Sequence, residues 1–170
     1  FVLNEISKLI LDICSTCSLD IHQIEAIGMG LPGSITPATS IMINGNSEIF
    51  INKNIIHDLK SKLSFSNEIY VDNDANLFAL AETFWGAGLK YQLKTGITPK
   101  NHLSIGVILG TGCGGGVIIN GAQLIGRNGG GGEIGHSVLV KDGIDCYCGR
   151  KGCAEQYLSG TGLELMYQRM

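Results

Sequence analysis

Apolar residues recur every three or four positions at the start of the chain, and further along they gather in short runs. Between residues 2 and 17 they fall on one helical face, which predicts an amphipathic helix. The runs at 24–30 and 68–74 predict two buried strands, and the first ends in a glycine loop. Residues 75–88 predict a helix that glycine closes. Helix, strand, connection, strand and helix in this order are typical of an α/β sheet.

The second half of the chain predicts strands separated by glycine-rich turns. Residues 102–109 and 115–121 predict paired strands. The dipeptide Asn120–Gly121 predicts a hairpin turn that leads into "AQLIG". The sequence "TGLE" at 161–164 resembles a capping box that opens a last helix. Residues 86–101 are more polar and hold a proline, so they predict a linker.

Composition indicates a folded chain and excludes some classes of protein. Hydrophobic residues make up 44% of the 170 residues and charged residues 16%, which is enough to bury a core. The net charge of −3 and the lack of a basic block give no indication that this segment binds nucleic acid. The apolar runs are too short to span a bilayer. The chain starts with Phe1 and lacks a basic leader, so we expect a central part of a longer protein.

Glycine is unusually frequent, with 25 residues that cluster mainly at 106–116 and 126–135. Residues 28–33 and 110–115 both match the spacing GxGxxG. Neither is followed by a predicted helix, whereas a dinucleotide site needs a helix N-terminus at the loop. The turn at 110–115 could instead point backbone N–H groups and a threonine hydroxyl at a phosphate. A glycine-rich hairpin without a ligand is the equally weighted alternative.

Carboxylates and amides follow the second predicted strand in "VDNDAN", residues 71–76. Ligands of open α/β sheets bind beyond the carboxyl ends of strands, so Asp74 could act as a general base toward a hydroxyl. Asn73 could hold a neighbouring hydroxyl. The alternative is that Asp74 only caps the following helix.

Three cysteines and a histidine have the spacing of a metal site. Cys146, Cys148 and Cys153 follow His136 of "GEIGH", and three thiolates with one imidazole form a donor set for structural zinc. A disulfide would leave one of the three thiols over, but unpaired or redox-active cysteines stay open. The CxxC at 14–17 continues the apolar face of the first helix, so we interpret both thiols as core residues.

Four motifs in this order resemble the ROK family (repressors, open reading frames and sugar kinases). They are "GMGLPGSIT", "VDNDAN", "LGTGCGGGVIINGAQLIGRNGGGGEIGH" and "CYCGRKGCAEQYLSG", and the resemblance covers about residues 24–165. Within the family, the first and last motifs are most similar to bacterial fructokinases and mannokinases, with N-acetylglucosamine kinases second.

The resemblance implies an actin-like ATPase (ribonuclease H-like) fold, with two α/β domains around a cleft. Residues 1–95 would be the remainder of the N-terminal domain, and residues 96–170 the first part of a larger C-terminal domain with the zinc site. The implied activity is ATP-dependent phosphorylation of a hexose hydroxyl, with Mg²⁺ on the ATP. The implied protein is a cytoplasmic homodimer.

The resemblance also assigns roles to residues. Asp74 would be the catalytic base, and Thr111 and Gly112 would belong to a phosphate-binding turn. Zinc would be bound by His136, Cys146, Cys148 and Cys153. The implied sugar contacts are Gly33, Ser34, Asn46, Asn73, Asp74, Glu133, His136 and Glu155. We expect the zinc to aim His136 and Glu155 at the sugar.

Two parts of the family pattern do not occur in the sequence. ROK kinases begin with a strand and a D-x-G-G-T-like phosphate loop, and a C-terminal part completes the nucleotide pocket. We therefore expect this chain alone to have little or no kinase activity. A sugar-responsive transcriptional repressor core is the first alternative function, and a zinc-stabilised binding module without catalysis is the second.

Overall fold

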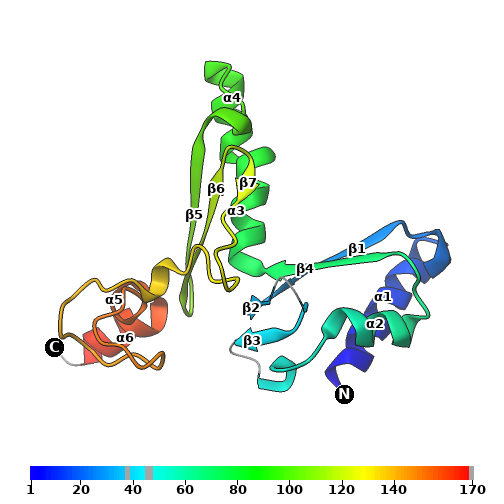
Figure 1. Cartoon of the computed structure of the whole chain (residues 1–170), viewed down its shortest axis with the longest axis horizontal. Coiled ribbons are helices and arrows are strands. Elements are labelled where there is room, and N and C mark those ends of the chain that lie inside the picture. The colour runs from blue at the N-terminus through cyan, green and yellow to red at the C-terminus, as the bar shows by residue number, and fades with distance from the viewer. Residues whose placement is uncertain (37–38, 45–47, 169–170) are drawn as a thin grey trace. The chain divides into compact units, whose positions relative to one another are not determined.

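A computed structural model describes residues 1–36, 39–44 and 48–168 (Figure 1). The chain divides into two compact units, Phe1–Asp74 and Ala75–Met170. Within the described residues, no helix is both long enough and apolar enough to cross a membrane.

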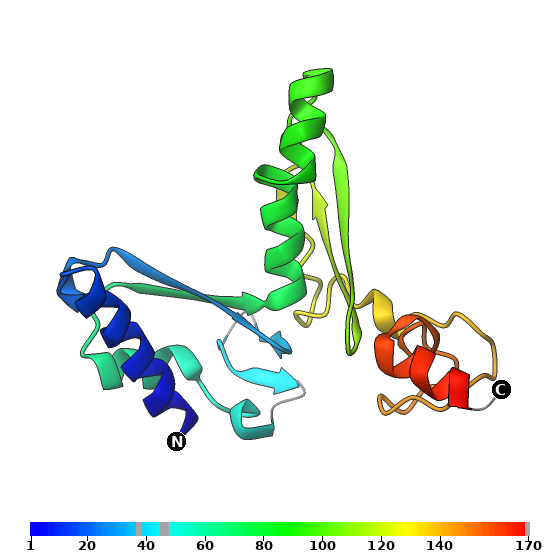
Figure 2. The ribbon, with the colours of Figure 1, turned by 180° about the vertical axis from the view of Figure 1, so that it is seen from behind.

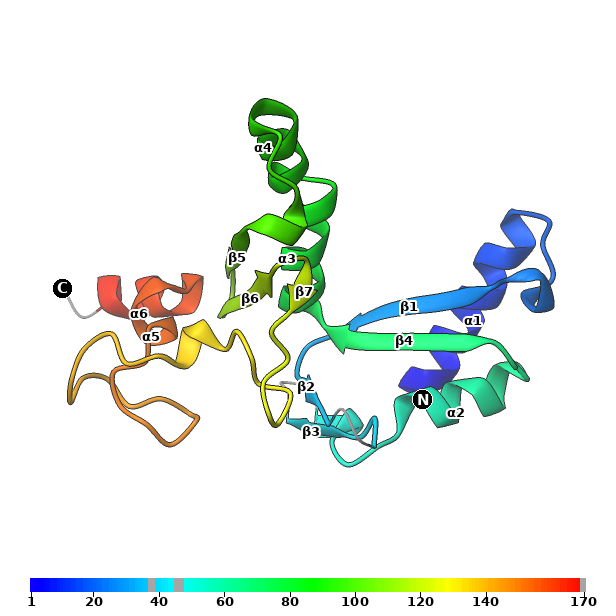
Figure 3. The ribbon, with the colours of Figure 1, turned by 45° about the horizontal axis from the view of Figure 1, so that its top comes forward.

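The first unit is built on a parallel strand pair. Strands β1 (Ala26–Leu31) and β4 (Glu68–Asn73) pair from Ala26 opposite Glu68 to Leu31 opposite Asn73 (Figure 3). The short strands β2 (Ser34–Ile35) and β3 (Met42–Asn44) form an antiparallel pair. Both predicted strands are therefore confirmed, with the first displaced by about one or two residues.

Two helices supply the apolar side chains that pack with these strands. Helix α1 (Val2–Thr16) confirms the predicted amphipathic helix, and α2 (Ile55–Leu63) follows a 3₁₀ turn at Glu48–Phe50. A further 3₁₀ turn occupies Ile21–Gln23. The Asn54 side chain caps α2 by accepting a hydrogen bond from the His57 N–H at 3.0 Å. The core cluster includes Cys14, Leu31, Met42, Phe50, Ile55, Leu59, Leu63, Phe65 and Ile69.

The second unit is built on an antiparallel hairpin packed against a helix (Figure 2). Strands β5 (Leu103–Leu109) and β6 (Cys113–Ile119) pair over seven residues, and β7 (Ala122–Gln123) extends β6. Asn120 and Gly121 both have positive φ, 53° and 80°, as the predicted hairpin turn requires.

Two glycines allow helix α3 (Asp74–Phe84) to lie directly on this hairpin. Gly106 and Gly116 face each other across β5 and β6. A Cβ atom on either glycine would lie 2.7 Å from the Cβ atom of Ala79 on α3, which is closer than any side chain tolerates. Glycine therefore sets the close spacing between helix and sheet.

The predicted linker at residues 86–101 is wrong. Helix α4 (Ala87–Thr95) occupies most of it, and a 3₁₀ turn at Pro99–Asn101 follows. Good helix formers such as Leu, Lys and Gln explain the helix, and Gly96 ends it with a φ of 75°. The polar composition reflects exposure, because no residue of α4 is buried. The domain boundary at residue 95 stays a prediction.

The chain ends in two helices, α5 (Glu155–Leu158) and α6 (Gly160–Gln168). The sequence did not predict α5, and the capping box at Thr161 is wrong. Instead, the Ser159 hydroxyl accepts a hydrogen bond from the Gly162 N–H at 3.0 Å. The Thr161 hydroxyl is directed elsewhere, since it donates to the Thr111 carbonyl at 2.8 Å.

Leu59 has no exposed surface within the first unit. We expect Leu59→Ala to lower the free energy of unfolding by about 3 kcal/mol, because it leaves a cavity in the core. Leu93→Ala on α4 is the control: Leu93 is 79% exposed, and its loss should change stability by less than about 0.5 kcal/mol. Chemical denaturation of the three proteins measures both effects, and equal losses would contradict the assigned core.

Candidate functional site

Residues 136–154 fold into a compact segment that we call the cysteine knuckle. His136 is the last residue of a 3₁₀ turn (Ile134–His136) and the first residue of the knuckle. Isolated antiparallel bridges join Val138 to Cys153 and Asp145 to Lys151. The Cys146 N–H donates to the Arg150 carbonyl at 2.8 Å, which closes the loop between the cysteines. The backbone therefore brings the three cysteines of the loop and His136 to one place.

Four side chains of the knuckle converge on one point. The ligand atoms of His136, Cys146, Cys148 and Cys153 all lie within 4.8 Å of one another. The Sγ atoms of Cys148 and Cys153 are 3.6 Å apart, and Cys146 Sγ lies 3.6 Å from His136 Nδ1. Zn–S bonds of about 2.3 Å at the tetrahedral angle place two sulfurs about 3.8 Å apart. The donor set and its spacing therefore fit zinc, while the sulfur separation is far too long for a disulfide.

The thiols of the knuckle differ in how readily they ionise. Burial raises the pKa of Cys148, but hydrogen bonds from the backbone and side chain of Arg150 outweigh it and lower the pKa to about 6. Burial, followed by hydrogen bonds with Cys148 and Cys146, raises the pKa of Cys153. Cys148 therefore offers a thiolate at neutral pH, and Cys153 would lose its proton only on binding a metal.

The segment that follows the knuckle makes hydrogen bonds with the glycine turn between β5 and β6. One Glu155 carboxylate oxygen accepts a hydrogen bond from the Cys113 N–H at 2.9 Å. The Gly160 N–H donates to the Gly110 carbonyl at 2.7 Å, beside the Thr161–Thr111 bond described above. A Cβ atom on Gly112 would lie 2.8 Å from the Glu155 oxygen. The turn predicted to bind phosphate is thus fixed by several contacts.

The end of β4 brings two predicted sugar contacts together in the first unit. The Asn73 side-chain amide donates to the Gly33 carbonyl at 3.1 Å. Asp72 accepts from the Asn73 N–H at 2.7 Å, and Asp74 is the first residue of α3. Ser34 is buried. Asn46, the remaining predicted contact of this unit, lies outside the described residues.

The predicted site residues thus form two groups, one in each unit. The first holds Gly33, Ser34, Asn73 and Asp74, and the second holds Thr111, Gly112, Glu133, His136 and Glu155. The structure brings the four predicted zinc ligands together, and it also joins Glu155 to the glycine turn. The roles of these residues toward sugar and nucleotide stay predictions.

The sequence analysis missed Tyr147, which lies between two cysteines of the knuckle. Its hydroxyl is 3.1 Å from His136 Nε2, and the two rings meet edge to face with centroids 5.2 Å apart. Burial, followed by the charge of Glu155, raises the pKa of Tyr147. Its position in the sequence between two predicted zinc ligands was the available signal.

The interpretation of both thiols of the CxxC at 14–17 as core residues needs correcting, because Cys14 is buried but Cys17 is exposed beyond the end of α1.

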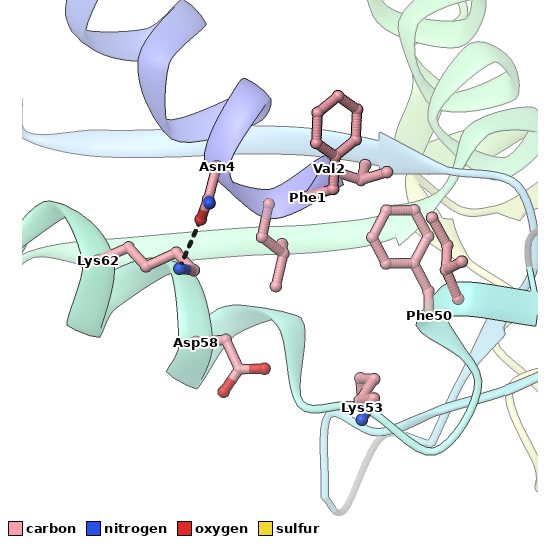
Figure 4. Close-up of a pocket in the computed structure, with 9 residues that line it drawn as sticks. Phe1, Val2, Asn4, Phe50, Lys53, Asp58 and Lys62 are labelled. Carbon is pink, nitrogen blue, oxygen red and sulfur yellow. Dashed lines mark hydrogen bonds between the residues drawn. The ribbon is translucent and has the colours of Figure 1, made fainter.

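A separate cavity of about 430 Å³ lies near the start of the chain (Figure 4). Phe1, Val2 and Phe50 contribute apolar walls, and Lys62 donates to the Asn4 side chain at 2.7 Å. None of the predicted site residues lines this cavity. It therefore gives no support to a ligand role.

Comparison with known proteins decides the family, because residues 3–170 match the ROK family over almost the whole chain. The chain belongs to the ROK family. It is 32% identical over 177 aligned residues to an N-acetyl-D-glucosamine kinase of Pectobacterium carotovorum, covering 98% of this chain and 54% of the relative. The chain thus spans about half the length of this curated relative.

Two crystal structures of ROK proteins share the fold. The ROK hexokinase from Thermus thermophilus superposes with a TM-score of 0.77 at 28% identity, over 99% of this chain and 50% of the hexokinase. A ROK family transcriptional regulator, a homologue of the Escherichia coli MLC protein, superposes with a TM-score of 0.75 at 23% identity. The superposition covers 99% of this chain and 39% of the regulator. These likenesses confirm the expected α/β fold of actin-like ATPases.

We expect the purified full-length protein to carry about one zinc per chain, held by the knuckle. Cys148→Ser removes one of four ligands and should lower the zinc content and the thermal midpoint of unfolding. Cys17→Ser is the matched control, because Cys17 is also exposed but belongs to the other unit. Elemental analysis and thermal denaturation measure both. A Cys148→Ser protein with full zinc content would remove this residue from the site.

Proposed function

We propose that the full-length protein is an ATP-dependent sugar kinase. The observation that carries the proposal is the end of β4, where Asp74 starts α3 directly after the Asn73 amide that binds the Gly33 carbonyl. A carboxylate at the carboxyl end of a parallel strand has the position that a general base toward a bound hydroxyl requires. Membership in the ROK family supports this interpretation.

In the proposed reaction, Asp74 takes the proton of one sugar hydroxyl. The sugar oxygen attacks the γ-phosphorus of ATP, the bond from that phosphorus to the bridging oxygen breaks, and ADP leaves. Mg²⁺ on the ATP would neutralise phosphate charge when bound. Such a transfer depends mainly on position and charge, so one carboxylate and backbone amides are sufficient protein groups.

The glycine turn of the second unit suits the phosphate role. Its backbone is held by hydrogen bonds with Glu155, Gly160 and Thr161. A turn that is already fixed loses little conformational entropy when it binds an anion. We therefore assign Thr111 and Gly112 to phosphate binding.

For the sugar, we propose N-acetylglucosamine as the substrate to test first. The curated relative that aligns with 98% of this chain is named an N-acetyl-D-glucosamine kinase. The two motifs that resemble fructokinases favour fructose instead, and mannose or glucose differ from these sugars at only one or two ring positions. Coupled ADP release by the full-length protein against this panel separates them.

The repressor alternative has its own support, since a ROK transcriptional regulator shares the fold. Retention of Asp74 together with Asn73, Glu133, His136 and Glu155 favours the kinase. A full-length protein that binds sugar but releases no ADP with any hexose of the panel would favour the repressor. The resemblance also leads us to propose a cytoplasmic homodimer.

Asp74→Asn tests the catalytic role. It should lower the turnover number of the full-length protein by about 10²- to 10⁴-fold, because amide nitrogen and oxygen cannot take the hydroxyl proton. Asp72→Asn is the matched control, since its remaining side-chain oxygen can still accept the hydrogen bond from the Asn73 N–H. ADP release at saturating sugar measures both, and undiminished turnover of Asp74→Asn would exclude Asp74 as the base.

Thr161→Val tests the support of the glycine turn. Loss of the bond to the Thr111 carbonyl should raise the KM for ATP about two- to tenfold, the value of one hydrogen bond, and change the KM for sugar less. Thr161→Ser keeps the hydroxyl and should restore the KM for ATP. Equal rises in both KM values would indicate general loosening of the unit instead of a local effect on the turn.

A further inference from the structure

The Tyr147 hydroxyl contacts the ring nitrogen of His136 that does not face the predicted zinc donors. His136 Nδ1 faces Cys146 Sγ at 3.6 Å and belongs to the converging donor set. His136 Nε2 points the other way, to the Tyr147 hydroxyl at 3.1 Å. Any ligand that is to bind His136 through its ring must therefore take the place of this hydroxyl.

The same hydroxyl has a second partner from the proposed sugar site, because the Glu155 carboxylate is a hydrogen-bond partner of Tyr147. A neutral hydroxyl can accept a hydrogen bond from a histidine N–H and donate its own O–H toward a carboxylate. A sugar hydroxyl bound by His136 and Glu155 would use the same donor and acceptor pattern.

Tyr147 can leave this position without disturbing a core. Its side chain is 71% exposed in a loop between two ligands of the knuckle. Rotation of exposed side chains is fast and costs little, so the contact with His136 can be exchanged for another hydroxyl.

We propose that Tyr147 competes with sugar for His136, and that its hydroxyl fills the place of a sugar hydroxyl until sugar binds. Sugar displaces the tyrosine from His136 and takes over its hydrogen bond. This inference rests on the proposed function. Protein in which Tyr147 is bonded to His136 cannot bind sugar in this way. The apparent dissociation constant for sugar therefore rises in inverse proportion to the fraction of protein in which Tyr147 has left His136.

Tyr147→Phe in the full-length, zinc-loaded protein tests the competition. The phenylalanine keeps the ring but cannot hold His136 Nε2, so N-acetylglucosamine should bind about two- to tenfold more tightly, the value of one hydrogen bond. Titration calorimetry measures the dissociation constant for the sugar. The ¹⁵N chemical shift of His136 Nε2 in the sugar-free protein should also change, and this readout does not depend on sugar binding.

Tyr157→Phe is the matched control within the same segment. Its hydroxyl accepts a hydrogen bond from the Ile144 N–H at 2.9 Å and is not a partner of His136. This variant should lose stability but keep the wild-type sugar affinity. Equal or weaker sugar binding by Tyr147→Phe would overturn the competition, even if wild type binds sugar well. Wild-type protein that binds no hexose of the panel would overturn the proposed function, and the displacement with it.

Discussion

Convergence of four donor atoms within 4.8 Å is the constraint on which the second unit depends. The donors come from the 3₁₀ turn at Ile134–His136 and from the loop that follows it. Cys153 is the last of them, and α5 begins two residues later. The position of the last donor therefore determines where α5 starts and where its first side chain, Glu155, points.

Glu155 links the knuckle to the glycine turn through a hydrogen bond. Its carboxylate accepts a hydrogen bond from the Cys113 N–H, and Gly160 and Thr161 further along the chain donate to the carbonyls of Gly110 and Thr111. The Gly110 and Thr111 carbonyls and the Cys113 N–H are thus bound within the protein. The proposed contact with an anion then falls to the backbone N–H groups of Thr111 and Gly112. The knuckle in this way contributes to the shape of the turn that we propose to bind phosphate.

Features that depend on sequence period or ligand spacing could be predicted, and features that depend on tertiary contacts could not. The helix at 2–16, the strand at 68–73 and the hairpin at Asn120 follow from local patterns. The four zinc donors follow from their spacing and chemistry. Thr161 looked like a helix cap because its sequence context is right, but the Thr111 carbonyl, fifty residues away, takes its hydroxyl. Similarly, nothing local could show that Tyr147 turns toward His136.

A bound metal would also decide the direction of the hydrogen bond between His136 and Tyr147. If His136 bound zinc through Nδ1, which lies beside the Cys146 sulfur, its ring proton would sit on Nε2, and His136 would donate to the Tyr147 oxygen. The tyrosine O–H could then donate to a carboxylate such as Glu155. In the other tautomer, with the proton on Nδ1, Nε2 accepts a hydrogen bond from the tyrosine O–H instead. Zinc in the knuckle would therefore set whether His136 donates a hydrogen bond to a hydroxyl or accepts one.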